Sequence, residues 1–227
     1  MKTKINCACN AQNVSAATAA GADFVGLPLG KEAQNSVVLQ PRCVGCMPDL
    51  VADSAALPAD EGRRGATIVV GMFADDTVQT VLTAVYNFNL DFVQLDGSEG
   101  AIFIDNLRRT IVPDIRKRLG VIKTITVAGE GDFDACREYE GVADMFLFRV
   151  AKGAADGLSA AALRRLLGAY KGGTPFLLAA DGGETDVRGI AEKCGGAFCG
   201  VDAEWSLTDE KGGVDVCRLR EFVNSKD

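Results

Sequence analysis

Charged side chains lie in or just after several short apolar segments of this chain. Four are acids, Asp96, Asp181, Asp202 and Glu204, and two are cations, Lys123 and Arg149. Carboxylates that gather at one place can hold Mg²⁺ or a cationic ligand. The same acids can instead pair with the two cations and fill a pocket with ion pairs. Because the acids show no metal-ligand spacing motif, we predict no metal site from them.

Two pairs of cysteines suggest a second kind of chemistry. Cys7 and Cys9 are separated by one residue, and Cys43 and Cys46 by two. Four neighbouring thiolates could bind zinc or an iron–sulfur cluster, and a C-x-x-C pair could be redox-active. The distance between the pairs matches neither motif well, and Cys43 and Cys46 fit one face of a helix. We therefore expect neither a metal nor another cofactor.

The composition excludes several functions. The 227 residues include no His, so Ser–His and Cys–His nucleophiles and His metal ligands are impossible. A net charge of −7 argues against binding to nucleic acid or to an anionic membrane. No apolar run approaches the roughly 18 residues of a membrane span, and the N-terminus shows no signal-peptide core. We predict a cytoplasmic protein with mostly reduced cysteines.

The order of the predicted elements favours a parallel barrel. Short runs rich in β-branched and aromatic residues predict eight strands, at 2–6, 23–28, 67–73, 91–94, 121–126, 143–148, 175–179 and 197–201. Helical periodicity lies between most of them, for example at 11–20 and 101–119. This alternation predicts a single (β/α)8 TIM barrel over residues 1–227, with an open doubly wound sheet as the alternative. Residues 29–66 are the least defined part, where only 44–56 could form a helix.

Four stretches resemble one known family. They are Lys4–Cys7 (KINC), Gly21–Gly26 (GADFVG), Gln94–Gly97 (QLDG) and Phe146–Arg149 (FLFR). Together they resemble phosphoribosylanthranilate isomerase, a barrel enzyme of tryptophan biosynthesis that needs no cofactor. The resemblance implies an Amadori rearrangement of a small-molecule ligand at the mouth formed by the carboxyl ends of the strands.

The two positions that the resemblance assigns to proton transfer are substituted. Asn6 stands where the family has its Cys base, and Arg149 stands where it has its Asp acid. An Asn amide has no basic form near neutral pH, and Arg keeps its proton. Cys7 could replace the base if a bulge turned it inward, although neighbouring strand residues normally face opposite sides. Asp144 or Asp156 could replace the acid, although neither ends a predicted strand.

The predicted ligand-binding positions differ from the family as well. The Ser-Gly-Gly of the seventh strand aligns with residues 179–181, ending in Asp181, while Gly182 and Gly183 follow two residues late. After the eighth strand come Glu204 and Trp205. We expect these residues, with Asp96 (where the family has His) and Lys123, to line the ligand site. The sequence alone favours a divergent member that has lost or replaced the isomerase reaction, such as a pseudoenzyme or a small-molecule-binding protein. The alternative is a working isomerase with Cys7 as its base.

Overall fold

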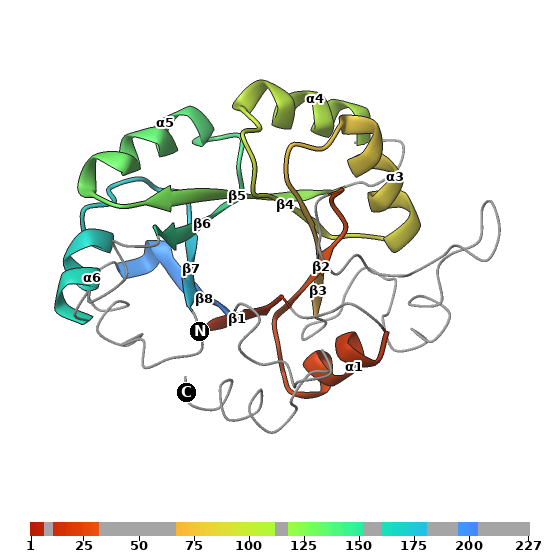
Figure 1. Ribbon diagram of the computed structural model, residues 1–227, viewed down its shortest axis with the longest axis horizontal. Helices are drawn as coiled ribbons and strands as arrows, with labels where there is room; N and C mark the ends of the chain where they lie inside the picture. Colours follow the sequence, from red (N-terminus) through yellow and green to blue (C-terminus); the bar gives the residue numbers. More distant parts are fainter. Residues whose placement is uncertain (7–10, 32–66, 112–117, 152–159, 181–194, 204–227) are drawn as a thin grey trace.

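The computed structural model describes residues 1–6, 11–31, 67–111, 118–151, 160–180 and 195–203 (Figure 1). Eight strands lie in this part of the chain. They are β1 (Lys2–Ile5), β2 (Phe24–Pro28), β3 (Ile68–Phe73), β4 (Phe92–Leu95), β5 (Gly120–Val127), β6 (Met145–Val150), β7 (Phe176–Ala180) and β8 (Phe198–Ala203). Each predicted strand is therefore present, with ends shifted by at most two residues.

The strands form one closed parallel barrel. Each strand pairs with the next, and β1 closes the ring by pairing in parallel with β8, with Lys4 beside Asp202. Figure 1 looks down the ring with the helices around its outside. Closure confirms the barrel and rules out the open doubly wound sheet, whose edge strands would be left unpaired.

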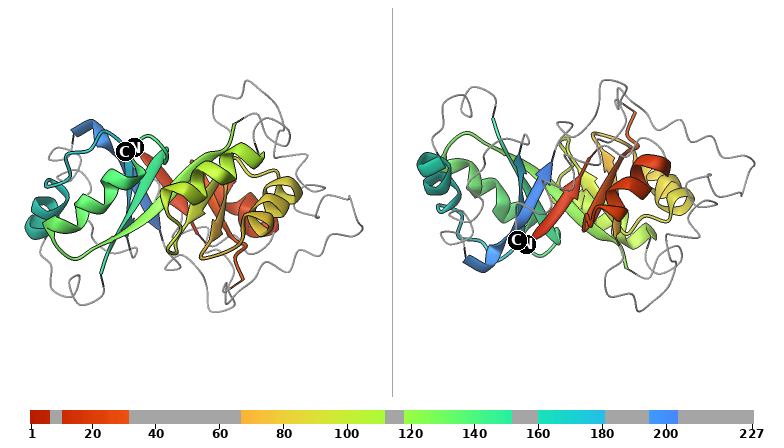
Figure 2. Two further views of the ribbon diagram at one scale, coloured as in Figure 1. Left: turned by 90° about the horizontal axis from the view of Figure 1, so that it is seen from above. Right: turned by 90° about the horizontal axis from the view of Figure 1, so that it is seen from below.

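Helices cover the outer surface of the barrel. They are α1 (Ala11–Ala19), α3 (Val78–Phe88), α4 (Ala101–Ile111), α5 (Cys136–Tyr139) and α6 (Ala160–Leu167), with 3-10 turns at Glu130–Ala135 and Gly195–Ala197. Helices α3 and α6 lie on opposite sides of the barrel (Figures 1 and 2). The predicted helix at 44–56 lies outside the described residues. None of the described helices is long and apolar enough to cross a membrane.

Local sequence explains where α3 begins and ends. The Thr77 side chain accepts a hydrogen bond from the backbone N–H of Thr80, which satisfies one of the free donors of the first turn. Asn89 ends the helix in the left-handed conformation, with φ of 49°, that Asn tolerates better than most residues. The chain then turns directly into β4.

Two apolar layers result from the alternation of side chains along the strands. The outer layer lies between barrel and helices and includes Ile5, Val25 and Val93. The inner layer fills the barrel with side chains such as Phe24 and Leu147. Successive strand residues face opposite layers, so residues two apart in a strand face the same side.

Candidate functional site

Strands β6 and β4 present polar side chains to the inside of the barrel at their carboxyl ends. In β6, Leu147 belongs to the inner layer, so Arg149 faces inward two residues later. In β4, Phe92 packs against the inner layer, which places Gln94 and then Asp96 on the same side. The backbone N–H of Asp96 still donates to Phe73 O at 2.8 Å, so the strand register continues through this residue.

Lys4, Asn6 and Asp202 form a buried polar cluster at β1 and β8. The Lys4 ammonium lies 3.2 Å from both Asp202 carboxylate oxygens, and both side chains are fully buried. The Asn6 amide donates to Asp202 Oδ2 at 2.8 Å, and its oxygen accepts a hydrogen bond from Lys4. Asn6 is 3% exposed. The cluster therefore fixes the side chain of Asn6, whose amide has no basic form near neutral pH.

Gly26 makes room for this cluster. A Cβ at this position would lie 2.5 Å from Asn6 Oδ1, 3.0 Å from Met72 Sδ and 3.3 Å from Lys4 Nζ. Any larger residue would have to displace the Asn6 amide. The absence of a side chain at Gly26 in β2 therefore leaves the space that the Asn6 amide occupies after β1.

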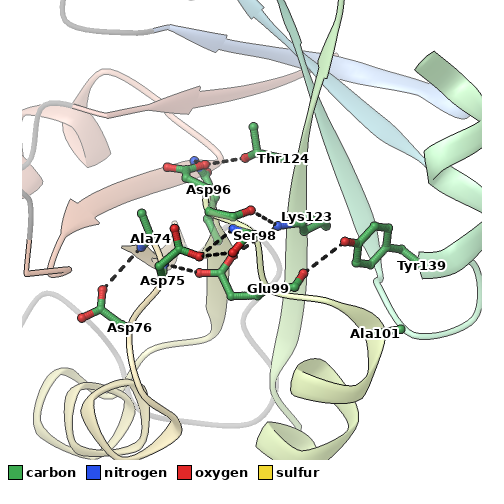
Figure 3. Close-up of polar contacts among 12 residues, drawn as sticks. Ala74, Asp75, Asp76, Asp96, Ser98, Glu99, Ala101, Lys123, Thr124 and Tyr139 are labelled. Carbon is green, nitrogen blue, oxygen red and sulfur yellow. Dashed lines mark hydrogen bonds and ion pairs between the residues drawn. The ribbon is translucent and has the colours of Figure 1, made fainter. Parts of the chain in front are cut away.

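Gln94, Asp96 and Thr124 form a second polar cluster, at the carboxyl end of β4 and on β5. The Gln94 amide donates to Asp96 Oδ1 at 2.8 Å. The Thr124 hydroxyl donates to the same oxygen (Figure 3). Gln94 is fully buried, whereas Asp96 is half-buried. Among the described residues, the amide oxygen of Gln94 has no hydrogen-bond partner. Asp96 was predicted as a ligand residue, and the structure places its carboxylate at the inward side of the mouth.

Lys123 belongs to a different environment, between the barrel and its helices. Its ammonium lies 3.2 Å from Glu99 Oε2, and both side chains are 3% exposed. It also lies over the ring of Tyr139, 5.6 Å from the centroid (Figure 3). Because Ile122 belongs to the inner layer, its neighbour Lys123 faces the other way. The structure does not bring Lys123 together with Asn6.

Loops after β3 and β4 support this ion pair. Glu99 accepts a hydrogen bond from the backbone N–H of Asp75 at 2.7 Å, and Tyr139 donates to Glu99 O at 3.2 Å (Figure 3). Hydrogen bonds from the hydroxyl and backbone N–H of Ser98 lower the pKa of the Asp75 carboxyl. Burial, with Glu138 and Glu99 nearby, raises the pKa of Tyr139. Sequence reasoning missed Glu99 because it lies in a loop without a motif.

The remaining predicted residues divide into two groups. Asp144 precedes β6, at the opposite end of the barrel from the mouth, where it pairs with Arg108 at 2.5 Å. Several predicted residues lie outside the described part of the chain. These are Cys7, Cys9, Cys43, Cys46, Asp156, Asp181, Gly182, Gly183, Glu204 and Trp205. Within the described residues, no three acids or cysteines are grouped in a way that could hold a metal ion.

Comparison with known proteins gives one family. The model of the N-(5'-phosphoribosyl)anthranilate isomerase family matches residues 51–224. The chain belongs to this family. The match covers most of the chain and confirms the resemblance that the four stretches indicate.

Relatives and solved structures agree with the family match. The isomerase of Methanocella arvoryzae is 29% identical over 93% of this chain and 91% of its own length. That of Parabacteroides distasonis is 29% identical over 68% of this chain and 66% of its own length. The isomerase structure from Thermus thermophilus covers the whole chain with a TM-score of 0.69 and 18% identity, which supports the barrel fold.

Proposed function

We propose that this chain is an N-(5'-phosphoribosyl)anthranilate isomerase. The observation that carries the proposal is that relatives aligned over more than nine-tenths of the chain bear that name, as does the family model. One solved structure of similar fold is a complex with reduced 1-(o-carboxyphenylamino)-1-deoxyribulose 5-phosphate. These similarities support an active isomerase better than the loss of activity favoured by the sequence alone, and they offer no evidence of such a loss.

The inward-facing side chains at the carboxyl ends of the strands determine the rate at which the isomerisation can proceed. The rearrangement needs a base to remove a proton from the sugar carbon beside the imine carbon, and an acid to protonate the ring oxygen. Asn6 and Arg149 can perform neither step. Each general acid or base contributes about 10²–10⁴-fold, whereas holding the substrate in a reactive geometry contributes separately. The proposal is therefore an isomerase that turns over slowly, as part of tryptophan biosynthesis.

A second candidate is favoured by one observation at β1. Asn6 is held by both Lys4 and Asp202 in a fully buried cluster, so its side chain cannot simply swing away to admit a neighbouring base. A barrel with this arrangement could bind a small molecule at its mouth without isomerising it. This second candidate is the divergent family member without isomerase activity that the sequence alone favours.

The loss of substrate fluorescence during turnover distinguishes the two candidates. The native chain is purified from a host that lacks its own isomerase and incubated with N-(5'-phosphoribosyl)anthranilate. A rate proportional to the protein concentration supports the isomerase. A silent native protein, beside an active Asn6→Cys/Arg149→Asp double variant, would instead establish a family scaffold that has lost its proton-transfer pair.

A further inference from the structure

Among the described residues at the mouth of the barrel, the carboxylate of Asp96 is placed to remove a proton. We infer that Asp96 is the base of this chain and takes the role that Asn6 cannot perform; this inference rests on the proposed isomerase function. Asp96 directly follows β4, whereas Asn6 directly follows β1, so the base would approach the ligand from the end of a different strand.

The side chain of Asp96 is anchored at one oxygen and available at the other. Oδ1 accepts hydrogen bonds from Gln94 at 2.8 Å and from Thr124. No hydrogen bond to Oδ2 joins it to the rest of the described chain, and the residue is half-buried. Its place two residues after Gln94 directs it toward the inside of the mouth. A base needs this combination of a fixed orientation and an accessible lone pair.

The amide of Gln94 is oriented so that its N–H group donates to Asp96. The Gln94 side chain is fully buried, and its amide N–H donates to the carboxylate, while its own oxygen has no hydrogen-bond partner among the described residues. Turning the amide over would place the amide oxygen against the carboxylate oxygen, and the two would repel each other. The donor orientation of Gln94 therefore fixes the direction of the Asp96 carboxylate.

Two other described carboxylates near the strand ends are engaged in ion pairs. Asp202 is fully buried and paired with Lys4, and Glu99 is 3% exposed and paired with Lys123. Asp96 is held instead by two neutral donors, both at Oδ1, so that its other oxygen stays available to a ligand.

The proposed step balances without any co-reactant. In the ring-opened substrate, protonated at its imine nitrogen, Asp96 Oδ2 takes the proton from C2. The C2–H electron pair forms the C1=C2 bond, and the π pair of C1=N moves to nitrogen, giving an enolamine. The neutral Asp96 then returns its proton to C1 while the enol hydroxyl proton leaves to water and the C2 carbonyl forms. The product is the ketose isomer, and Asp96 is again ionised.

The test compares Asp96→Asn with a control of the same chemical change, Asp105→Asn, on the exposed side of α4. An Asn at 96 can still accept hydrogen bonds from Gln94 and Thr124, so the fold should persist. We expect kcat to fall about 10²–10⁴-fold in Asp96→Asn and to stay within twofold of native in Asp105→Asn. Calorimetric binding of reduced 1-(o-carboxyphenylamino)-1-deoxyribulose 5-phosphate should be unchanged, and adding Asn6→Cys should restore part of the turnover.

Each outcome of this test either supports or overturns the role of Asp96 as the base. Native-like kcat in Asp96→Asn overturns the role of Asp96 and leaves the proposed isomerase intact. Loss of analogue binding together with kcat assigns Asp96 to binding and also overturns its role as base. If the native chain itself is silent, the proposed function fails and the inference fails with it. Should Asp96→Asn not fold, Asp96→Ser carries the same expected loss of kcat and decides in its place.

Discussion

Replacing Lys4 with methionine removes one half of an ion pair whose side chains are both fully buried. Methionine has a similar length and no charge, so the variant removes the ammonium with little change in volume. The Asp202 carboxylate then loses the ammonium of Lys4. Removing one partner of a buried pair costs about 3–5 kcal/mol, because the ion pair no longer offsets the desolvation of the remaining charge. We expect the free energy of unfolding to fall by that amount.

Urea denaturation followed by circular dichroism measures this loss. The matched control is Arg109→Met, which breaks an exposed pair with Asp105 whose side chains are 78% and 48% exposed. An exposed pair contributes about 0–1 kcal/mol, so the control should be nearly native. The double variant Lys4→Met/Asp202→Asn should recover part of the loss, because no charge is left buried. A loss below about 1 kcal/mol for Lys4→Met would refute the reasoning.

Three further predictions concern packing and titration. Gly26→Ala should lower the free energy of unfolding by about 1–3 kcal/mol in urea, because the new Cβ would meet Asn6 at 2.5 Å; a native-like midpoint would contradict this. Burial raises the pKa of the Cys136 thiol to about 12, so iodoacetamide at pH 8 should modify it only after unfolding, as mass spectrometry would detect. Hydrogen bonds from two backbone N–H groups lower the pKa of Asp132 below its usual 3.8. The native protein should therefore have a higher free energy of unfolding than Asp132→Ala at pH 7, and this difference should shrink as the pH falls through the lowered pKa. A difference that grows in acid would contradict this.

The fold could be predicted from the sequence because its signal is repeated eight times. The apolar and aromatic composition of residues 143–148, for example, predicts a strand there, and β6 spans Met145–Val150. An error of two residues at a strand end leaves the barrel unchanged. The number of strands and their alternation with helices favour a closed barrel, but the pairing of β1 with β8 that excludes the open doubly wound sheet is visible only in the structure.

The site could be predicted only in part, because its contacts join distant residues. Strand order and alternation predict that Asp96 follows a strand and faces inward, and the structure places it so; its role as a ligand residue stays a prediction. The partners of the buried lysines were missed. Lys4 and Asp202 are separated by 198 positions, and nothing in the sequence indicates that they meet. Lys123 was expected at the mouth, but its strand register places it in the outer layer with Glu99.

Turnover of N-(5'-phosphoribosyl)anthranilate by the native chain tests the proposed function most directly. The protein is purified from a host without its own isomerase, and the initial rate of fluorescence loss is recorded at several protein concentrations. We expect a slow rate that rises in proportion to the concentration of the native protein and falls in the Asp96→Asn variant. A native protein that is folded, binds the reduced product analogue and still shows no rate would contradict it.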